Sequence, residues 1–525
     1  MQKTGSRSLA LAWPRAVAWP AGLVVLLIVV AYGYGRSLGS FFVSDDLDML
    51  AGDATDLLSP ASGFGRFMPL AAAVHRAVAA SSGLDPLPAH ALQLALHLAC
   101  TLLVYALAWR LVDPAGRPRA RWIALAAAAL FALYPRHHQV VLWFGAVSIG
   151  LASTLALGAA LAFLCAWRGG DARAGWASVV LGGGALLAHE SAVALPGLLV
   201  AIGLYEASRA RRPPFGRPPA WLWAGAGLLA LHLALLAWAY RARAAAYPDS
   251  GYRFLGLGGD LLVAPLRYAA QLLVPPPWTE VLAGDALGLA VGAMALLAAA
   301  LWFWRGGALA RLGLAWAALA AAPFVLFGVY GVADRYYYLA SAGLALAAAT
   351  SLARWPRALA ALVGSLGVAG VLLLGQASDQ WWAAGRTTET VLSNLAAWSR
   401  RAEAGQDTPD GVLFVGAPFK RGERWPGSQV YVFSTGLAGA AHLATGWPAL
   451  RVSYVFHDEY PSLARQLGTR LPAPGPAGLY LFALDDGQLT DLTDRLGGAL
   501  SDLAALHWRG ASRAPVDWDR YAGAP

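Results

Sequence analysis

Long apolar runs separated by short polar loops fill the first 376 residues of the chain. Runs of about 20 apolar residues are long enough for a helix to cross the hydrocarbon core of a bilayer. The pattern predicts about eleven membrane-spanning helices, at 17–35, 89–112, 120–134, 140–167, 174–188, 191–206, 220–240, 283–304, 309–331, a tenth that ends near 354, and 358–375. Two segments of mixed polarity, from about 65 and over 259–274, fit helices that lie in the membrane interface or re-enter it.

The pattern changes after residue 376. Trp381 and Trp382 are typical of an interfacial anchor, and glycine, proline and charge then return. Four short apolar runs follow, at 411–416, 429–434, 450–456 and 478–483, and helix-like stretches follow the second and fourth, at 437–445 and 488–505. This alternation predicts a small α/β domain. We therefore expect a mainly α membrane part (1–376), an interfacial connector (377–404) and a water-facing α/β domain (405–525).

Composition and charge exclude a soluble globular protein and argue against nucleic-acid binding. The chain is 58% hydrophobic and only 13% charged, where soluble chains average roughly 25% charged residues. Residues 1–376 hold 26 Lys and Arg against 15 Asp and Glu, whereas 377–525 hold 13 against 15. The basic excess thus belongs to the loops between apolar runs, where it predicts cytoplasmic sides. It places the N-terminus in the cytoplasm and the C-terminal domain outside.

Polar groups with chemical potential gather at the predicted outer ends of the spans. Asp45 and Asp46 follow the first span, and the acidic stretch continues to Asp53 and Asp56. Carboxylates are costly in hydrocarbon, so this stretch must lie in water or line a wet cavity. The other candidates at these loop junctions are Arg66, His137, His138, His189, Glu190, Asp334 and Arg335. Each alone fits an interfacial or capping residue, and Asp334 with Arg335 fits a simple ion pair.

No cofactor is predicted. The histidines at 137, 138 and 189 with Glu190 are residue types that suit zinc, but they lack the close spacing of a ligand motif. A divalent metal is thus left open without being indicated. The sequence has no phosphate-cradling glycine loop and no nucleophile elbow, which argues against a nucleotide-dependent reaction.

The acidic pair resembles a known enzyme family. Asp45-Asp46 after the first span is similar to the acidic pair in the first outer loop of GT-C glycosyltransferases, membrane enzymes that use lipid-phosphate-linked sugars. Residues 130–143 resemble the F-A-L-H-P-x-H-x-E-A-V-A-W stretch of the tetratricopeptide-repeat-containing transmembrane O-mannosyltransferases and their bacterial relatives, with His138 at the second His. The likeness covers about residues 1–350 in order.

Two further motifs extend the likeness, with departures. Residues 189–196 resemble K-E-x-x-x-x-x-P with Glu190 on the Glu, and 334–339 resemble E-R-Y-x-Y-L with Arg335 on the Arg. The chain departs from the family pattern where Tyr134 replaces the first His, Gln139 the Glu and His189 the Lys. The segment 67–70 lacks the Arg of Y-R-P-L, although Arg66 lies nearby, and no tetratricopeptide repeats follow. The acceptor of the family is therefore not carried over.

The resemblance implies a site and a reaction. It implies a polyprenyl-phosphate sugar donor whose lipid lies between helices in the bilayer, and an acceptor hydroxyl on a glycan, lipid or protein at the outer face of the bacterial cytoplasmic membrane. A carboxylate would serve as general base, and arginines would bind the leaving phosphate. The expected roles are Asp45 or Asp46 as base, Arg66 and Arg335 at the phosphate, and His137, His138, Glu190 and Asp334 in positioning.

Two other readings stay open. A transporter or flippase for a lipid-linked glycan would place ionisable residues near the middle of the membrane or on both faces. Here the apolar runs are nearly free of charge and the candidate residues lie on one face, which favours the enzyme. An inactive relative of the enzymes that serves in assembly is the third reading.

Overall fold

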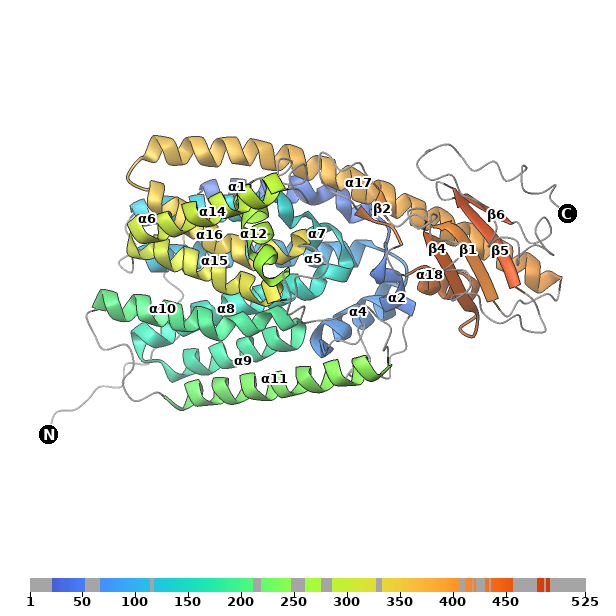
Figure 1. Ribbon diagram of the computed structural model, residues 1–525, viewed down its shortest axis with the longest axis horizontal. Helices are drawn as coiled ribbons and strands as arrows, with labels where there is room; N and C mark the ends of the chain where they lie inside the picture. The colour runs from blue at the N-terminus through green and yellow to red at the C-terminus, as the bar shows by residue number, and fades with distance from the viewer. Residues whose placement is uncertain are drawn as a thin grey trace.

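The computed structural model describes residues 21–51, 67–113, 118–210, 219–246, 260–274, 286–326, 333–405, 411–417, 420–421, 430–433, 436–456, 479–485 and 488–491. Its larger part is a bundle of long helices, and a smaller part with a β-sheet lies beyond one end of the bundle (Figure 1). The prediction of a polytopic helical membrane protein with an α/β part is confirmed.

Each predicted span contains a helix of the bundle. The span predicted at 140–167 is interrupted at Trp143, the one at 191–206 begins with a separate short helix, and residues 327–331 of the span predicted at 309–331 lie outside the described chain. The helices of the bundle are α1 (Ala21–Gly35), α5 (Leu87–Val112), α6 (Pro118–Ala132), α8 (Val147–Gly169), α9 (Ala172–Ala188), α10 (Leu195–Ala210), α11 (Ala220–Ala246), α14 (Ala286–Arg305), α15 (Ala308–Leu326), α16 (Tyr338–Leu352) and α17 (Pro356–Ala404). Eight helical segments of the described chain are long and apolar enough to cross a membrane. The helices α6, α9 and α16 are shorter, with 15, 17 and 15 residues. They pack against α5, α8 and α15, so the bundle contains all the predicted runs.

Short helices occupy the loops between the spans. They are η1 (Arg36–Gly39), α2 (Asp45–Ala51), α4 (Pro69–Ser82), η3 (Pro135–His137), α7 (His138–Leu142), η4 (Phe144–Ala146), η5 (Glu190–Ala194), α12 (Asp260–Leu273) and η7 (Asp334–Tyr337). Figure 1 shows α2 and α4 at the end of the bundle that faces the sheet. Helices are thus present in both segments expected to lie in the interface, and every candidate site residue in the described chain belongs to a short helix or borders one.

The last helix of the bundle, α17, runs without a break for 49 residues. At 1.5 Å per residue this is about 74 Å, more than twice the roughly 30 Å of a hydrocarbon core. Residues 377–404, expected as a connector, are therefore a direct extension of the last span. Trp382 is half-exposed, but Trp381 is fully buried in the protein. The expectation of Trp381 as an interfacial anchor is wrong, because its indole packs among loops of the bundle.

The C-terminal part contains a four-stranded sheet of order β4-β1-β5-β6. The central strand β1 (Gly411–Ala417) pairs in parallel with β4 (Arg451–Phe456) and β5 (Leu479–Asp485), so that Val412 lies between Val452 and Tyr480. A separate antiparallel pair is formed by β2 (Lys420–Arg421) and β3 (Val430–Tyr431). Helix α18 (Leu437–Thr445) has the predicted bounds.

One prediction in this part is wrong. The stretch that begins at 488 was expected to be helical, yet β6 (Gln488–Asp491) is a strand antiparallel to β5. The sequence carried the relevant signal, because Asp486-Gly487 between two apolar stretches is typical of a two-residue hairpin turn. Residues 492–505 lie outside the described part of the chain.

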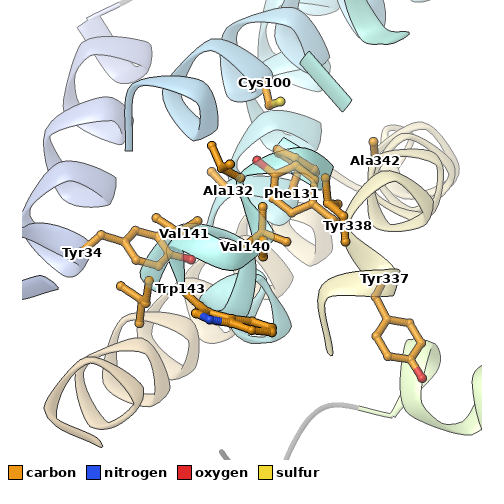
Figure 2. Close-up of a cluster of buried hydrophobic side chains, with 14 of the residues drawn as sticks. Tyr34, Cys100, Phe131, Ala132, Val140, Val141, Trp143, Tyr337, Tyr338 and Ala342 are labelled. Carbon is orange, nitrogen blue, oxygen red and sulfur yellow. The ribbon is translucent and has the colours of Figure 1, made fainter. Parts of the chain in front are cut away.

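The apolar core is continuous from the bundle into the C-terminal part. Figure 2 shows one section of it, where Tyr34, Phe131, Val141 and Tyr338 from α1, α6, α7 and α16 approach one another. The same cluster of buried residues includes Leu395 of α17, Phe433 and Leu437. The helix α18 packs on both α17 and the acidic helix α2. The C-terminal part therefore rests directly on the loop that carries the acidic pair.

Candidate functional site

The two carboxylates of the acidic pair lie in different surroundings. Both begin helix α2, and the preceding residue, Ser44, has a left-handed backbone with φ +53°. The side chain of Asp46 is 1% exposed, and its Oδ2 accepts a hydrogen bond of 3.0 Å from the Val43 amide. Asp45 is partly exposed, and its Oδ1 accepts a bond of 3.1 Å from the Ser44 hydroxyl. Asp45 is thus the member of the pair that a ligand can reach.

Burial changes the chemistry of Asp46. It raises the pKa of the Asp46 carboxyl well above its ordinary value, and the charge of Asp45 adds to the rise. The Val43 amide, with the Gly145 amide and the Trp143 indole, favours the charged form and offsets part of that rise. Its Oδ1 accepts no hydrogen bond within the described part of the chain. Asp46 therefore keeps its proton to a higher pH than an ordinary aspartate.

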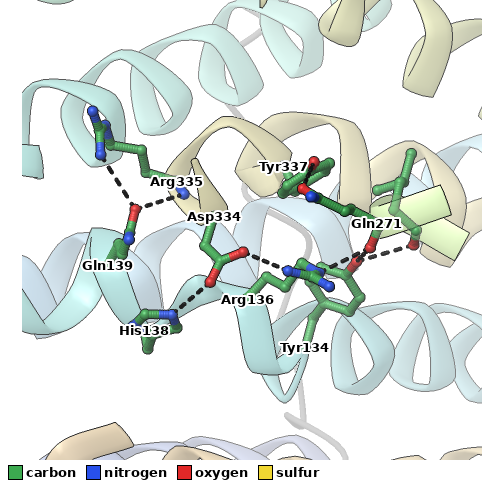
Figure 3. A network of polar contacts seen from close by, with 9 residues as sticks. Tyr134, Arg136, His138, Gln139, Gln271, Asp334, Arg335 and Tyr337 are labelled. Carbon is green, nitrogen blue, oxygen red and sulfur yellow. Dashed lines mark hydrogen bonds and ion pairs between the residues drawn. The ribbon is translucent and has the colours of Figure 1, made fainter. Parts of the chain in front are cut away.

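A second cluster joins three loops that are far apart in the sequence. Asp334 of η7 accepts from Arg136 Nη1 at 2.5 Å and from His138 Nε2 at 2.8 Å (Figure 3). Arg136 is 1% exposed, and its Nε donates to the Gln271 carbonyl at 2.8 Å. The neighbouring Arg335 is not the residue that pairs with Asp334 here. The buried ion pair instead fixes η3, η7 and α12 against one another.

The protonation of His138 follows from its two partners. The Trp381 indole N–H, which can only donate, contacts His138 Nδ1 at 3.1 Å. Nδ1 must then carry the lone pair and Nε2 the proton that is donated to Asp334. This arrangement satisfies both bonds, so His138 orients the Asp334 carboxylate by donating to it.

The electrostatics of Asp334 oppose those of Asp46. Burial alone would raise the pKa of Asp334, but the Arg136 guanidinium and His138 lower it to about 2. Burial likewise disfavours the charged guanidinium, yet Asp334 raises the pKa of Arg136 above its ordinary value. Both Arg136 and Asp334 are charged at neutral pH, and each neutralises the charge of the other.

Arg335 lies on the other side of η7. Its guanidinium carbon is 5.0 Å from the centre of the Trp143 ring and 4.8 Å from that of Tyr336. Its backbone N and Nη1 both donate to Gln139 Oε1 at 3.3 Å. Gln139 stands where the family motif has Glu, so a neutral oxygen rather than a carboxylate holds this arginine here. The flat guanidinium between rings suits recognition of an oxyanion.

Trp143 connects the acidic and cationic sides. Its indole faces the Asp46 carboxylate, and its ring lies under Arg335. The same ring stacks on Trp381 with the centres 6.1 Å apart. The acidic helix and Arg335 therefore meet at Trp143, and the His138–Asp334 cluster reaches the same ring through Trp381. We call these residues a single neighbourhood.

The remaining expected residues lie apart from this neighbourhood or outside the described chain. His137 is fully buried, its Nε2 donates to Ser341 Oγ at 2.8 Å, and its ring is 4.5 Å from that of Tyr338. Burial lowers the pKa of His137 well below its usual value, so it is a neutral core residue. Arg66, Asp53 and Asp56 lie outside the described residues.

Glu190 and His189 form a separate corner at the start of η5. Their Oε2 and Nε2 are 3.8 Å apart, and Glu190 is mostly buried. An aromatic series leads from there to Arg335, because Phe324 lies beside His189 and stacks on Tyr336 at 4.3 Å. An apolar cavity of about 210 Å³ begins just past this corner. It lies between α8, α9, α10 and α11, and Ala192 and Leu195 are among the residues that line it.

The four residues considered as zinc ligands do not converge. His137 faces Ser341, His138 faces Trp381 and Asp334, and His189 caps η5 by accepting from the Ser191 amide at 3.1 Å. Among the described residues, no three His, Cys, Asp or Glu side chains are grouped as a metal site requires. Cys100 and Cys165 are both free thiols.

Sequence reasoning missed four residues of this neighbourhood. Arg136, Trp143 and Trp381 touch candidate residues, and Gln271 binds Arg136. Arg136 and Trp143 lie within the motif-like stretch at 130–143, so an unexpected arginine there was an available signal. Nothing in the sequence near Gln271 or Trp381 indicates that α12 and α17 reach the same place.

Comparison with known proteins adds a likeness of fold. No protein-family model matches the chain, and no curated protein matches it in sequence. It is similar to the crystal structure of ArnT from Cupriavidus metallidurans bound to undecaprenyl phosphate, with 13% identity and a TM-score of 0.45, over 92% of this chain and 95% of that one. The bound undecaprenyl phosphate belongs to that protein. The chemistry of this chain is therefore argued from its own residues.

Proposed function

We propose that this chain is a GT-C-type glycosyltransferase. It would transfer a sugar from a polyprenyl-phosphate donor to an acceptor hydroxyl at the outer face of the bacterial cytoplasmic membrane. The N-terminus would lie in the cytoplasm and the C-terminal part outside, as the distribution of basic loops predicts. The observation that carries the proposal is the meeting of the acidic helix and Arg335 around Trp143.

In the proposed reaction, Asp45 acts on the acceptor and Arg335 on the leaving phosphate. The partly exposed carboxylate of Asp45 takes the proton of the acceptor hydroxyl. The acceptor oxygen then forms a bond to the anomeric carbon of the sugar, the bond from that carbon to the phosphate oxygen breaks, and the electron pair leaves with the lipid phosphate. Arg335 stabilises the charge that develops on this phosphate. No metal or cofactor is needed to balance the reaction.

Differences in burial support one assignment among the alternatives that the sequence left open. Asp46 is enclosed and its pKa is raised, whereas Asp45 is partly exposed, so we assign the base to Asp45. Arg136 is bound to the Asp334 carboxylate and the Gln271 carbonyl. Arg335 donates to the neutral Gln139 Oε1, so we assign Arg335 as the phosphate ligand. His138 and Asp334 hold η7 in place, and Glu190 would contact the donor at the other end of the aromatic series.

The lipid part of the donor has a suitable place in the apolar cavity next to Glu190. Its lining is almost entirely apolar and includes Phe163, Leu195 and Trp221. The transporter alternative is supported less well. The described ion pair inside the bundle, between Arg168 of α8 and Glu206 of α10, lies near the helix ends farthest from the candidate site and is satisfied by two bonds of 2.7 and 2.6 Å.

The test is transfer of labelled sugar from a polyprenyl-phosphate donor by membranes that contain Asp45→Asn. Removal of a general base lowers rates by about 10²–10⁴-fold, and Asn is nearly isosteric. The matched control is Asp379→Asn, an exposed carboxylate that pairs only with exposed Arg36 among the described residues, and it should keep full activity. Arg335→Lys should also lose at least about tenfold, because Lys lacks the planar donor geometry. Full activity of Asp45→Asn, or transport of intact donor without transfer, contradicts the proposal.

A further inference from the structure

The C-terminal part holds the acidic helix directly. Asp48 of α2 accepts two backbone hydrogen bonds of 2.9 Å, from Gly436 to Oδ2 and from Gly439 to Oδ1. Ser44, just before α2, donates its backbone N–H to the Val432 carbonyl at 2.7 Å. Both ends of the first turn of α2 are thus bound to the segment 432–439, and we call this set of contacts the α2 clamp.

Two glycines permit this close approach. Gly436 has φ +87°, and a Cβ there would lie 1.9 Å from the Ser44 carbonyl oxygen. A Cβ on Gly439 would lie 2.5 Å from the Leu47 oxygen. Because both obstacles are backbone atoms, no side-chain rotation could relieve them. Any side chain at either position must push the segment away from α2.

The acidic helix cannot hold its own conformation. It has only seven residues, whereas isolated helices below about 12–15 residues are marginal in water. The residue that leads into it, Ser44, is the non-glycine residue with positive φ in the described part of the chain. Such a conformation is unfavourable for a residue with a side chain and persists only when its surroundings impose it. The α2 clamp supplies those surroundings.

Asp48 and Asp45 are linked by the geometry of the helix. Residues three apart lie on neighbouring positions of the same face. A carboxylate that is fixed at position 48 by two amides therefore fixes where the side chain at position 45 emerges. Proton abstraction requires a base within about 2.6–3.2 Å of the acceptor oxygen, so a shift of α2 by 1 Å is large on the scale of the reaction.

We infer that Asp48, with the glycines at 436 and 439, is a positioning element for Asp45, and that the C-terminal part thereby completes the catalytic site. This inference rests on the proposed function. Asp48 does not touch the reacting atoms. It acts through α2, by holding the base at the place where the acceptor hydroxyl must arrive.

The test uses the full-length chain with Asp48→Asn and Gly439→Ala. Asn offers only one acceptor oxygen for two amides, and Ala pushes the segment off Leu47. We expect kcat for sugar transfer to fall by about 10–100-fold, since misplacement by 1 Å can cost about 10²-fold. The KM for the lipid-linked donor should stay within about twofold, because the phosphate and lipid contacts are untouched. A general loss of folded protein would also lower the maximal rate without changing KM, so kcat is calculated per amount of folded protein in every variant.

Gly446→Ala is the matched control. Gly446 ends α18 with φ +71°, but a Cβ there meets no atom within 4 Å. The control thus bears the cost of a side chain at positive φ in the same helix without disturbing α2. Its kcat and KM should equal those of the wild type after correction for the amount of folded protein.

Hydrogen–deuterium exchange of the amides in 45–51 separates this inference from the proposed function. Exchange should quicken at least about tenfold in Asp48→Asn and Gly439→Ala and stay unchanged in Gly446→Ala. Unchanged exchange in the first two variants, or quickened exchange with an unaltered kcat, overturns the positioning role. A wild-type protein that transfers no sugar contradicts the proposed function, while the exchange data still decide whether the clamp holds α2.

Discussion

The acidic helix and the Arg136–Asp334 cluster contain the same kind of side chain in opposite states. Asp334 is mostly enclosed, with 13% of its side chain exposed, beside a guanidinium and an imidazole N–H, and its pKa falls to about 2. Asp46 is buried with backbone amides, an indole and another carboxylate nearby, and its pKa rises. The partner, rather than the depth of burial, decides whether a buried carboxylate is a permanent anion or a proton holder. Here the permanent anion, Asp334, fixes loops, and the proton holder, Asp46, lies beside the carboxylate that we propose as the base.

The largest effect is expected where the permanent anion loses its partner. Arg136→Met should cost about 3–5 kcal/mol of unfolding free energy, because it leaves Asp334 charged and buried. The double variant Arg136→Met with Asp334→Asn should recover most of that loss. The control is Arg386→Met, which breaks an exposed pair with Glu389 and should cost no more than about 1 kcal/mol. The measurement is the thermal unfolding midpoint in detergent. Equal midpoints for the single and the double variant would contradict the pairing of Arg136 with Asp334.

Acid should weaken the same cluster without any substitution. A folded-state pKa of about 2, below the ordinary value of about 3.9, means that the stability from Asp334 is present above about pH 4 and lost as the pH falls towards 2. The shift corresponds to roughly 2–3 kcal/mol. Unfolding midpoints measured from pH 5 to pH 2 should show a smaller acid-induced decrease for Asp334→Asn than for the wild type. Parallel curves would contradict the pairing.

A smaller effect is expected at the edge of the cluster. The Tyr337 hydroxyl donates to Gln271 Oε1 at 2.5 Å, and its ring also lies 5.5 Å from the Arg136 guanidinium carbon. Tyr337→Phe keeps the ring and removes the hydrogen bond, so it should cost about 1 kcal/mol. Tyr32→Phe, at an exposed position of α1, is the control and should be neutral. Equal unfolding midpoints for the two variants would show that the hydroxyl contributes nothing.

The smallest effect, with the opposite sign, is expected for the proton holder. Because the folded-state pKa of Asp46 is raised, ionisation of Asp46 costs stability as the pH rises above about 4. Asp46→Asn cannot ionise and keeps an oxygen for the Val43 amide. Its free energy of unfolding at pH 7 should equal that of the wild type or exceed it by no more than about 1 kcal/mol. The difference between the two proteins should vanish at pH 4. A large loss at pH 7 would mean that Asp46 works as an anion.

The length of apolar runs predicted the bundle well, because crossing a bilayer imposes the same length and polarity on every span. Runs at 411–416, 450–456 and 478–483 likewise gave strands of the sheet. The hairpin at β6 was missed because its residues also suit a helix, and pairing with β5 decided the outcome.

The site was predictable only as a set of loops on one face. Asp334, Arg335 and His138 were recognised from local motifs, but their partners were not. Arg136 and Asp334 are 198 residues apart, and His138 and Trp381 are 243 apart. Which of several polar residues meet at such distances depends on how the helices pack, and a single sequence does not record that packing. Adjacency was misleading as well, since it suggested Arg335 as the partner of Asp334.

The clamp on α2 also has a consequence for the order of synthesis. Asp48 leaves the ribosome 388 residues before Gly436 does, which is a delay of roughly 20–80 s at about 5–20 residues per second. During that interval the amides that hold Asp48 do not yet exist, and Ser44 has no carbonyl at 432 to bind. A nascent chain already inserted among its lipids therefore carries an unfinished site. On the proposed function, activity would start only when nearly the whole polypeptide has been made, so unfinished chains would not consume the donor.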